Sequence, residues 1–114
     1  MMIWTNNAFV YITEHEADPA LLVVRGRFKG DVDRFLLAPI AIETPDDEYR
    51  YRACAKREDV ALALKRIIND INYQALLSSI RTTRRFGVVA AVNRLMAAAQ
   101  VEEPWHLPHM DQRP

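Results

Sequence analysis

Cysteine and glycine are scarce in this chain. Cys54 is the one cysteine among 114 residues, so an intramolecular disulfide framework is excluded. The three glycines, Gly26, Gly30 and Gly87, fit no spacing of the glycine-rich loops that cradle phosphates. A disulfide-stapled fold and a glycine-loop nucleotide site are therefore both excluded.

Long hydrophobic runs are also missing. The longest nearly apolar stretch, residues 86–99, contains Asn93 and Arg94 and is too short to span a bilayer. The first residues lack the basic start and the long apolar run of a secretory leader. We therefore expect a cytoplasmic protein without membrane contact.

The chain carries no net charge, because 15 basic residues balance 15 acidic ones. A general attraction to nucleic acid is therefore not expected. The charges are nevertheless segregated along the chain. No carboxylate lies between Asp70 and Glu102, although this segment contains Arg81, Arg84, Arg85 and Arg94. Acidic residues gather instead in a cluster formed by Asp46, Asp47 and Glu48.

Alternating side chains predict three to four strands in the first half of the chain. Residues 8–13 and 20–27 are expected to form a hairpin, with Pro19 closing the turn. Residues 40–44 are a short strand or an extended link, and residues 49–56 are the clearest strand. Its alternation places Tyr49, Tyr51, Ala53 and Ala55 on one side, and Arg50, Arg52, Cys54 and Lys56 on the other.

Helical spacing governs most of the remaining chain. Asp31 is expected to cap a short helix over residues 32–37, and a long helix begins at Glu58. One or two turns over residues 74–81 precede a last helix that Thr82 or Thr83 caps. The order β-β-α-β-β-α-α predicts an α+β fold, with two to three helices on one face of a small antiparallel sheet. Residues 1–100 are predicted to form a single domain, and residues 101–114 a C-terminal tail.

Candidates for catalysis and metal binding are few. A cysteine nucleophile needs a base within reach, but Cys54 lies in the middle of a strand and His15 lies in a turn. We therefore expect Cys54 to be a buried or half-buried filler. His106 and His109 lack a third metal ligand in the sequence. No enzyme activity, metal or cofactor is expected.

A sheet face is the candidate for nucleic-acid binding, since such faces combine aromatic platforms with cations. The aromatic candidates are Phe9, Tyr11, Tyr49 and Tyr51, and the cationic candidates are Arg25, Arg27, Arg50, Arg52 and Lys56. Tyrosine and arginine alternate along residues 49–56 and so point in opposite directions. We therefore expect the aromatic side to pack beneath the helices and the arginines to line the open side.

Binding to another protein is the leading hypothesis, because complementary charged patches steer partners and set specificity. Arg84 and Arg85 lie where a helix dipole repels cations, and the cluster at residues 46–48 is expected to compensate them. The predicted partner-binding residues are Arg81, Arg84, Arg85, Asp46, Asp47, Glu48 and Trp105. Single-stranded nucleic-acid binding through the arginine-lined sheet face is the alternative. An alanine-rich last helix also leaves a homodimer open.

Three segments carry a resemblance to a known family. They are "MIWTNNAFVYI", "DPALLVVRGRFKGDVDRF" and "TPDDEYRYRACAKREDVALALKRIINDINY". Together they resemble a family of short, uncharacterised bacterial and phage-borne proteins, and the resemblance covers most of residues 2–100. It implies no established activity. A phage or mobile-element inhibitor of a larger host complex, similar to anti-CRISPR proteins, is the expectation that we associate with it.

Overall fold

The structure is a computed structural model, and it describes residues 1–71 and 75–102. The chain divides into two compact units, Met1–Gln74 and Ala75–Pro114. In the first unit the described elements are β1 (Met2–Trp4), β2 (Phe9–Glu14), β3 (Leu21–Gly26), α1 (Asp31–Leu36), β4 (Ile42–Glu43), β5 (Tyr51–Lys56) and α2 (Arg57–Asn69). In the second they are α3 (Leu76–Ile80) and α4 (Arg84–Glu102). The expected single domain over residues 1–100 stays a prediction.

The five strands form one sheet in the order β1-β2-β3-β5-β4, and every neighbouring pair is antiparallel. The predicted α+β class and the predicted hairpin of β2 and β3 are therefore confirmed. The sheet has five strands, whereas three to four were predicted. The strand that the prediction missed is β1, which has only three residues and is too short to show alternation. Thr5 shapes the turn between β1 and β2: its amide donates a 2.9 Å hydrogen bond to the carbonyl of Ala8.

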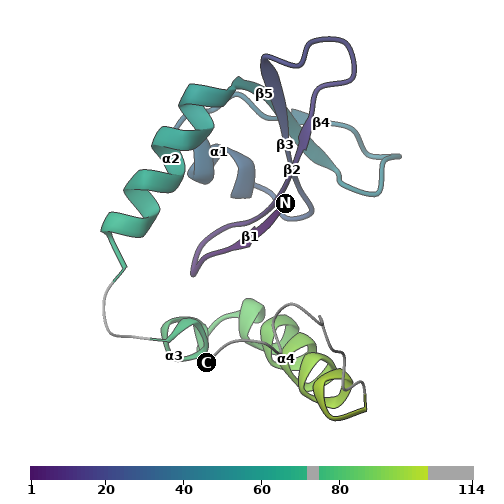
Figure 1. Ribbon diagram of the computed structural model, residues 1–114, viewed down its shortest axis with the longest axis vertical. Coiled ribbons are helices and arrows are strands. Elements are labelled where there is room, and N and C mark those ends of the chain that lie inside the picture. Colours follow the sequence, from purple (N-terminus) through teal and green to yellow (C-terminus); the bar gives the residue numbers. More distant parts are fainter. Residues whose placement is uncertain (72–74, 103–114) are drawn as a thin grey trace, which may run out of the picture. The chain divides into compact units, whose positions relative to one another are not determined.

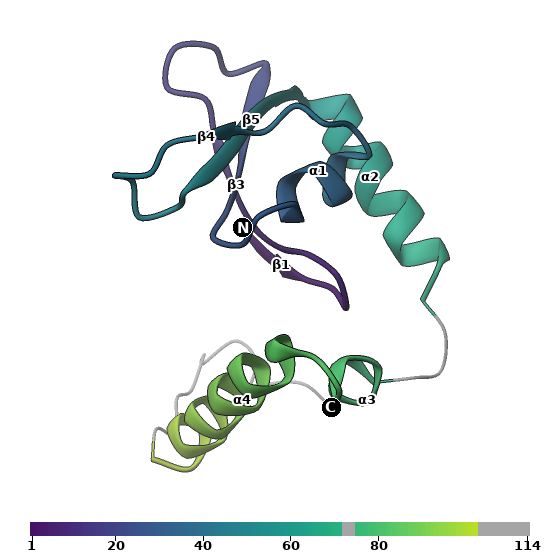
Figure 2. The ribbon, with the colours of Figure 1, turned by 180° about the vertical axis from the view of Figure 1, so that it is seen from behind.

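Helices α1 and α2 cover one face of this sheet (Figures 1 and 2). Alternation directs every second side chain of a strand toward them. Val10 and Ile12 of β2, Val24 of β3 and Ala53 of β5 are buried in the core beneath the helices. The helices contribute the buried side chains Val32, Phe35, Val60 and Ala63. The predicted alternation of the strand over residues 20–27 is confirmed by this packing.

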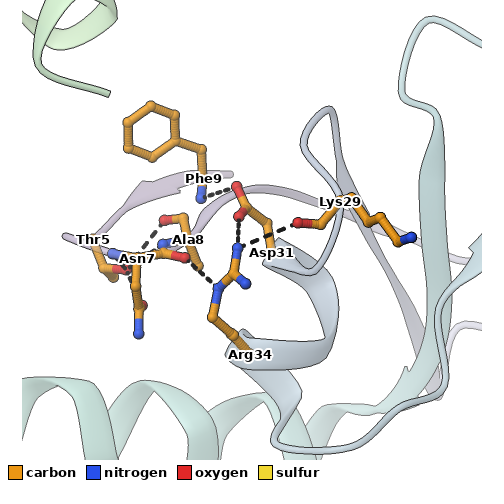
Figure 3. A network of polar contacts seen from close by, with 7 residues as sticks. All are labelled: Thr5, Asn7, Ala8, Phe9, Lys29, Asp31 and Arg34. Carbon is orange, nitrogen blue, oxygen red and sulfur yellow. Dashed lines mark hydrogen bonds and ion pairs between the residues drawn. The ribbon is translucent and has the colours of Figure 1, made fainter. Parts of the chain in front are cut away.

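Asp31 does not cap α1, contrary to the prediction. The helix begins at Asp31 itself, its N-cap is Gly30, and no side chain caps it. The fully buried Asp31 carboxylate instead accepts a 2.9 Å hydrogen bond from the Phe9 amide of β2 and forms an ion pair with Arg34. Arg34 also donates from Nε to the Asn7 carbonyl at 2.8 Å (Figure 3). This network joins α1 to the start of β2.

The second unit contains α3 and α4, which contact each other. Ile80 of α3 and Val89 of α4 are buried, whereas Leu95 and Met96 of α4 are exposed. The described residues contain four helices, whereas two to three were predicted. The additional helix is α3, which is only five residues long and lies where one or two turns were expected. None of the helices in residues 1–71 and 75–102 combines the length and the apolar character needed to cross a membrane.

Candidate partner-binding face of the sheet

The face of the sheet opposite α1 and α2 is called the open face below. Since Val10, Val24 and Ala53 point into the core, the residues next to them in each strand point to the open face. Within the described residues 1–71, both helices pack on the core side, and no helix packs on the open face. Side chains on this face are therefore the first candidates for contact with a ligand.

Tyr11, Arg25 and Arg52 form one row across the open face. Tyr11 of β2 pairs with Arg25 of β3, and Arg25 pairs in turn with Arg52 of β5. Directly paired residues of neighbouring strands share a face. The expected separation of an aromatic side from a cationic side is therefore wrong, because alternation orders residues only within one strand. The register between strands brings both kinds together.

Tyr49 also belongs to the open face, and its predicted position beside Tyr51 is wrong. Its ring stacks on Tyr11, with 5.3 Å between the ring centroids and 23° between the planes. The guanidinium carbon of Arg27 lies 4.4 Å from the centroid of the Tyr49 ring, within the range of a cation–π contact. β5 begins only at Tyr51, so the alternation of the strand does not reach Tyr49. Tyr51 itself packs against the core, as predicted.

A second aromatic group lies at the β1 side of the sheet. Trp4 and Phe9 are paired in the register of β1 and β2, and their rings stack with centroids 5.1 Å apart. Phe28 meets the edge of Phe9 at 6.1 Å. Phe9 is buried, whereas Phe28 is exposed and Trp4 is half-buried. The two outer rings thus extend the aromatic part of this face.

The acidic cluster at residues 46–48 folds onto the arginines of the sheet. Glu48 forms an ion pair with Arg27 at 2.9 Å, and Asp47 forms one with Arg52 at 3.4 Å. The hydrogen bond that Arg27 donates to the Glu48 carboxylate, with a further contribution from Tyr49, raises the pKa of the Arg27 guanidinium above its ordinary value. Two of the three carboxylates are therefore engaged inside the first unit. Asp46 is exposed.

Arg25 differs from Arg52 in the row because no carboxylate of the described residues pairs with it. It forms no hydrogen bond or ion pair with the described part of the chain, and its Nε is shielded from solvent. The hydroxyl oxygen of Thr13 is likewise shielded from solvent and has no hydrogen-bond partner in the described residues. Both residues line an open depression of about 440 Å³ on the open face. Its other lining residues are Tyr11, Glu16, Asp47, Glu48, Tyr49 and Arg52.

Other predicted site residues lie at the margins of the first unit or in the second. Arg50, just before β5, and Lys56, the last residue of β5, are both exposed. In the second unit Arg81 and Arg84 are exposed, Arg85 is half-buried, and the first turn of α4 holds no acidic residue. Trp105, His106 and His109 lie outside the described residues.

The predicted burial of Cys54 is wrong, since its side chain is exposed. Cys54 pairs with Val23 in the register of β3 and β5 and lies on the open face. His15 is occupied by the turn after β2, where its Nδ1 accepts hydrogen bonds from the amides of Ala17 and Asp18. Among residues 1–71 and 75–102, no group of three or more His, Cys, Asp or Glu side chains is placed to hold a metal ion.

Comparison with family models, curated proteins and solved structures finds no match to this chain. The resemblance to short bacterial and phage-borne proteins therefore stays a prediction.

Proposed function

We propose that this protein is a non-catalytic protein-binding module and that the open face of its sheet is the binding surface. The observation that carries the proposal is the gathering of Tyr11, Tyr49, Arg25 and Arg52 on a sheet face that the helices of its own unit leave uncovered. Tyrosine, tryptophan and arginine are the residues that most often dominate binding energy at protein interfaces.

The balance of charge on this face supports a protein partner. Glu48 and Asp47 neutralise Arg27 and Arg52, so the surface offers both signs of charge around aromatic rings. Protein interfaces have this composition, with an aromatic centre and a polar rim. Arg81, Arg84 and Arg85 stay a predicted second contact, since they lie in the other unit.

The biological setting is part of the same proposal. We place the protein in the cytoplasm, because the exposed thiol of Cys54 is preserved in a reducing compartment. The resemblance described above supports a role as a phage or mobile-element inhibitor that occupies a larger host complex. If the protein partner is a second copy of this chain, the same proposal describes a homodimer.

Affinity capture from host lysate, quantified by mass spectrometry, tests the proposal. The baits are the unmodified chain, a Tyr11→Ser/Tyr49→Ser variant, and an Arg94→Gln control in the exposed part of α4. A partner that the unmodified chain and the control retain, and that the tyrosine variant loses at least tenfold, supports the proposal. Retention of the same proteins by all three baits within twofold contradicts it.

Single-stranded nucleic-acid binding is the second candidate, favoured by the row of Tyr11, Arg25 and Arg52 on one face. Arg27 and Arg52 would have to leave Glu48 and Asp47 before they could contact phosphates. For this reason nucleic-acid binding ranks second. Fluorescence anisotropy with a 20-nucleotide oligothymidine tests it. Binding that falls steeply between about 50 and 200 mM salt and that Arg25→Gln abolishes would replace the protein-binding proposal.

A further inference from the structure

We infer that α4, the long green-to-yellow helix in Figure 1, joins two copies of this chain as an antiparallel pair of helices. The contact surface is a stripe along α4, called the α4 seam below, and it consists of Arg85, Val88, Val92, Leu95, Ala99 and Glu102. The seam lies in the second unit. The inference is therefore independent of the proposed function, which rests on the open face of the sheet.

Helix α4 is much longer than the helix that packs on it. It has 19 residues, whereas α3 has five. Val89 is the one residue of α4 that is buried, and every residue from Asn93 to Glu102 is exposed. A helix in water gains most of its stability from the packing of an apolar face. The second half of α4 therefore lacks the contacts that normally stabilise a helix of this length.

The exposed part of α4 carries large apolar side chains. Leu95 is 71% exposed and Val88 is 39% exposed, and exposed apolar groups that lie together mark interaction surfaces. Along the seam the apolar positions Val88, Val92, Leu95 and Ala99 are four, three and four residues apart. This alternation keeps them on one side of the helix and is the spacing of helices that pack together along their length.

A second copy in the antiparallel direction matches the seam layer by layer. With the two-fold axis between residues 93 and 94, Leu95 of one copy lies opposite Val92 of the other. Ala99 then lies opposite Val88, and symmetry repeats both layers. Each layer pairs a larger side chain with a smaller one, as close packing of facing helices requires. One sequence thus provides both sides of the interface.

The charges at the two ends of α4 favour the antiparallel direction. Its first turn contains Arg84 and Arg85 and no acidic residue, and Glu102 ends the helix. In the antiparallel pair Arg85 of one copy faces Glu102 of the other at both ends. A parallel pair would place like charges opposite each other. The negative end of the partner's helix dipole would also lie near the two arginines and stabilise them.

Sedimentation equilibrium of the full-length chain, from about 5 to 500 μM, tests the association. We expect a monomer–dimer equilibrium. Leu95→Glu brings carboxylates into the two central layers and should weaken the dimer at least tenfold. Ala97→Glu is the matched control, because it introduces the same side chain at an exposed position on the opposite side of α4. It should leave the dimer unchanged within twofold.

Glu102→Gln tests the charge pairing separately. It should weaken the dimer about threefold at low salt, since it removes two ion pairs at the ends of the seam, and the difference should vanish at high salt. Circular dichroism below the dissociation constant checks that each variant keeps the helical content of the unmodified monomer. The substituted residues are exposed in the single chain, so the monomer should fold normally.

Cross-linking determines the direction of the pair. In a Cys54→Ser background, one chain carries Ala91→Cys and a second chain with a different tag carries Ala98→Cys. Both positions flank the seam on the same side of α4. The antiparallel pair brings residue 91 of one copy close to residue 98 of the other, so a short thiol cross-linker should join chains with different tags. A parallel pair would join chains with the same tag.

Three results would overturn the inference: a monomer at every concentration, equal weakening by Leu95→Glu and Ala97→Glu, and cross-links mainly between chains with the same tag. The Tyr11→Ser/Tyr49→Ser variant separates this inference from the proposed function. A dimer that this variant loses and that Leu95→Glu keeps would place self-association on the open face and overturn the α4 seam. A dimer that only Leu95→Glu loses supports the seam, whatever the lysate capture retrieves.

Discussion

Tyr11 and Tyr49 stack with their ring centroids 5.3 Å apart, and this contact attaches the acidic loop to the middle of the sheet. Tyr11 is fixed in β2, whereas Tyr49 lies just before β5 begins. The loop carries Asp47 and Glu48, whose carboxylates reach Arg52 and Arg27. This aromatic pair thus joins the antiparallel pairing of β4 and β5 in holding the acidic cluster beside the arginines.

Tyr49→Ala should lower the free energy of unfolding by about 1–2 kcal/mol, since it removes an aromatic stack and a cation–π contact. Urea denaturation followed by circular dichroism measures this change. Tyr49→Phe is the control, because it keeps the ring and should stay within about 0.5 kcal/mol of the unmodified chain. A Tyr49→Ala variant as stable as the control would show that the stack contributes nothing.

Asp31→Ala should destabilise the protein by about 2–3 kcal/mol, because it leaves the Phe9 amide without its buried acceptor and Arg34 without its carboxylate. The same urea titration measures the effect. Asp46→Ala removes an exposed carboxylate and should change the stability by less than about 0.5 kcal/mol. Equal losses in the two variants would contradict the structural role of the buried network.

Gly30→Ala should cost about 1–2 kcal/mol, since the backbone φ of 89° lies in the left-handed region. An added Cβ would also lie 2.6 Å from the Arg34 guanidinium that pairs with Asp31. Gly87→Ala is the matched control in α4, where nothing lies within 4 Å of the added carbon. It should raise the helical content and the melting temperature, because alanine favours a helix by up to about 1 kcal/mol over glycine. Effects of the same sign in both variants would contradict this prediction.

The Arg27–Glu48 ion pair should contribute little to stability despite its 2.9 Å distance. Its side chains are 51% and 75% exposed, and exposed pairs couple by about 0.2–1 kcal/mol. A double-mutant cycle with Arg27→Gln and Glu48→Gln, repeated at high salt, measures the coupling. A salt-insensitive coupling above about 2 kcal/mol would mean that the pair is shielded from solvent.

Cys54 should react with Ellman's reagent in the folded protein, because its side chain is exposed on the open face. We expect about one equivalent of thiol to react without denaturant, at a rate close to that in urea. Cys54→Ser is the blank. Reaction only after unfolding would show that Cys54 is covered in solution, as the sequence had predicted.

The local patterns of this protein follow from the order of its residues alone. Strand alternation placed Val24 and Ala53 toward the helices and Arg25 and Arg52 away from them, because the period of two residues is a property of the extended chain. The helical spacing after Glu58 likewise located α2, which runs from Arg57 to Asn69. These features depend on neighbours along the chain, so the order of residues is enough to read them.

Which local faces meet depends instead on how the strands and loops pack in three dimensions. The register of β2, β3 and β5 brought Tyr11 beside Arg25 and Arg52, and a loop outside the strand carried Tyr49 to the same place. The buried Asp31 bonded to a distant amide instead of its own helix. These contacts join segments far apart in the sequence, and their energies depend on the packing of the whole unit, which no local period encodes.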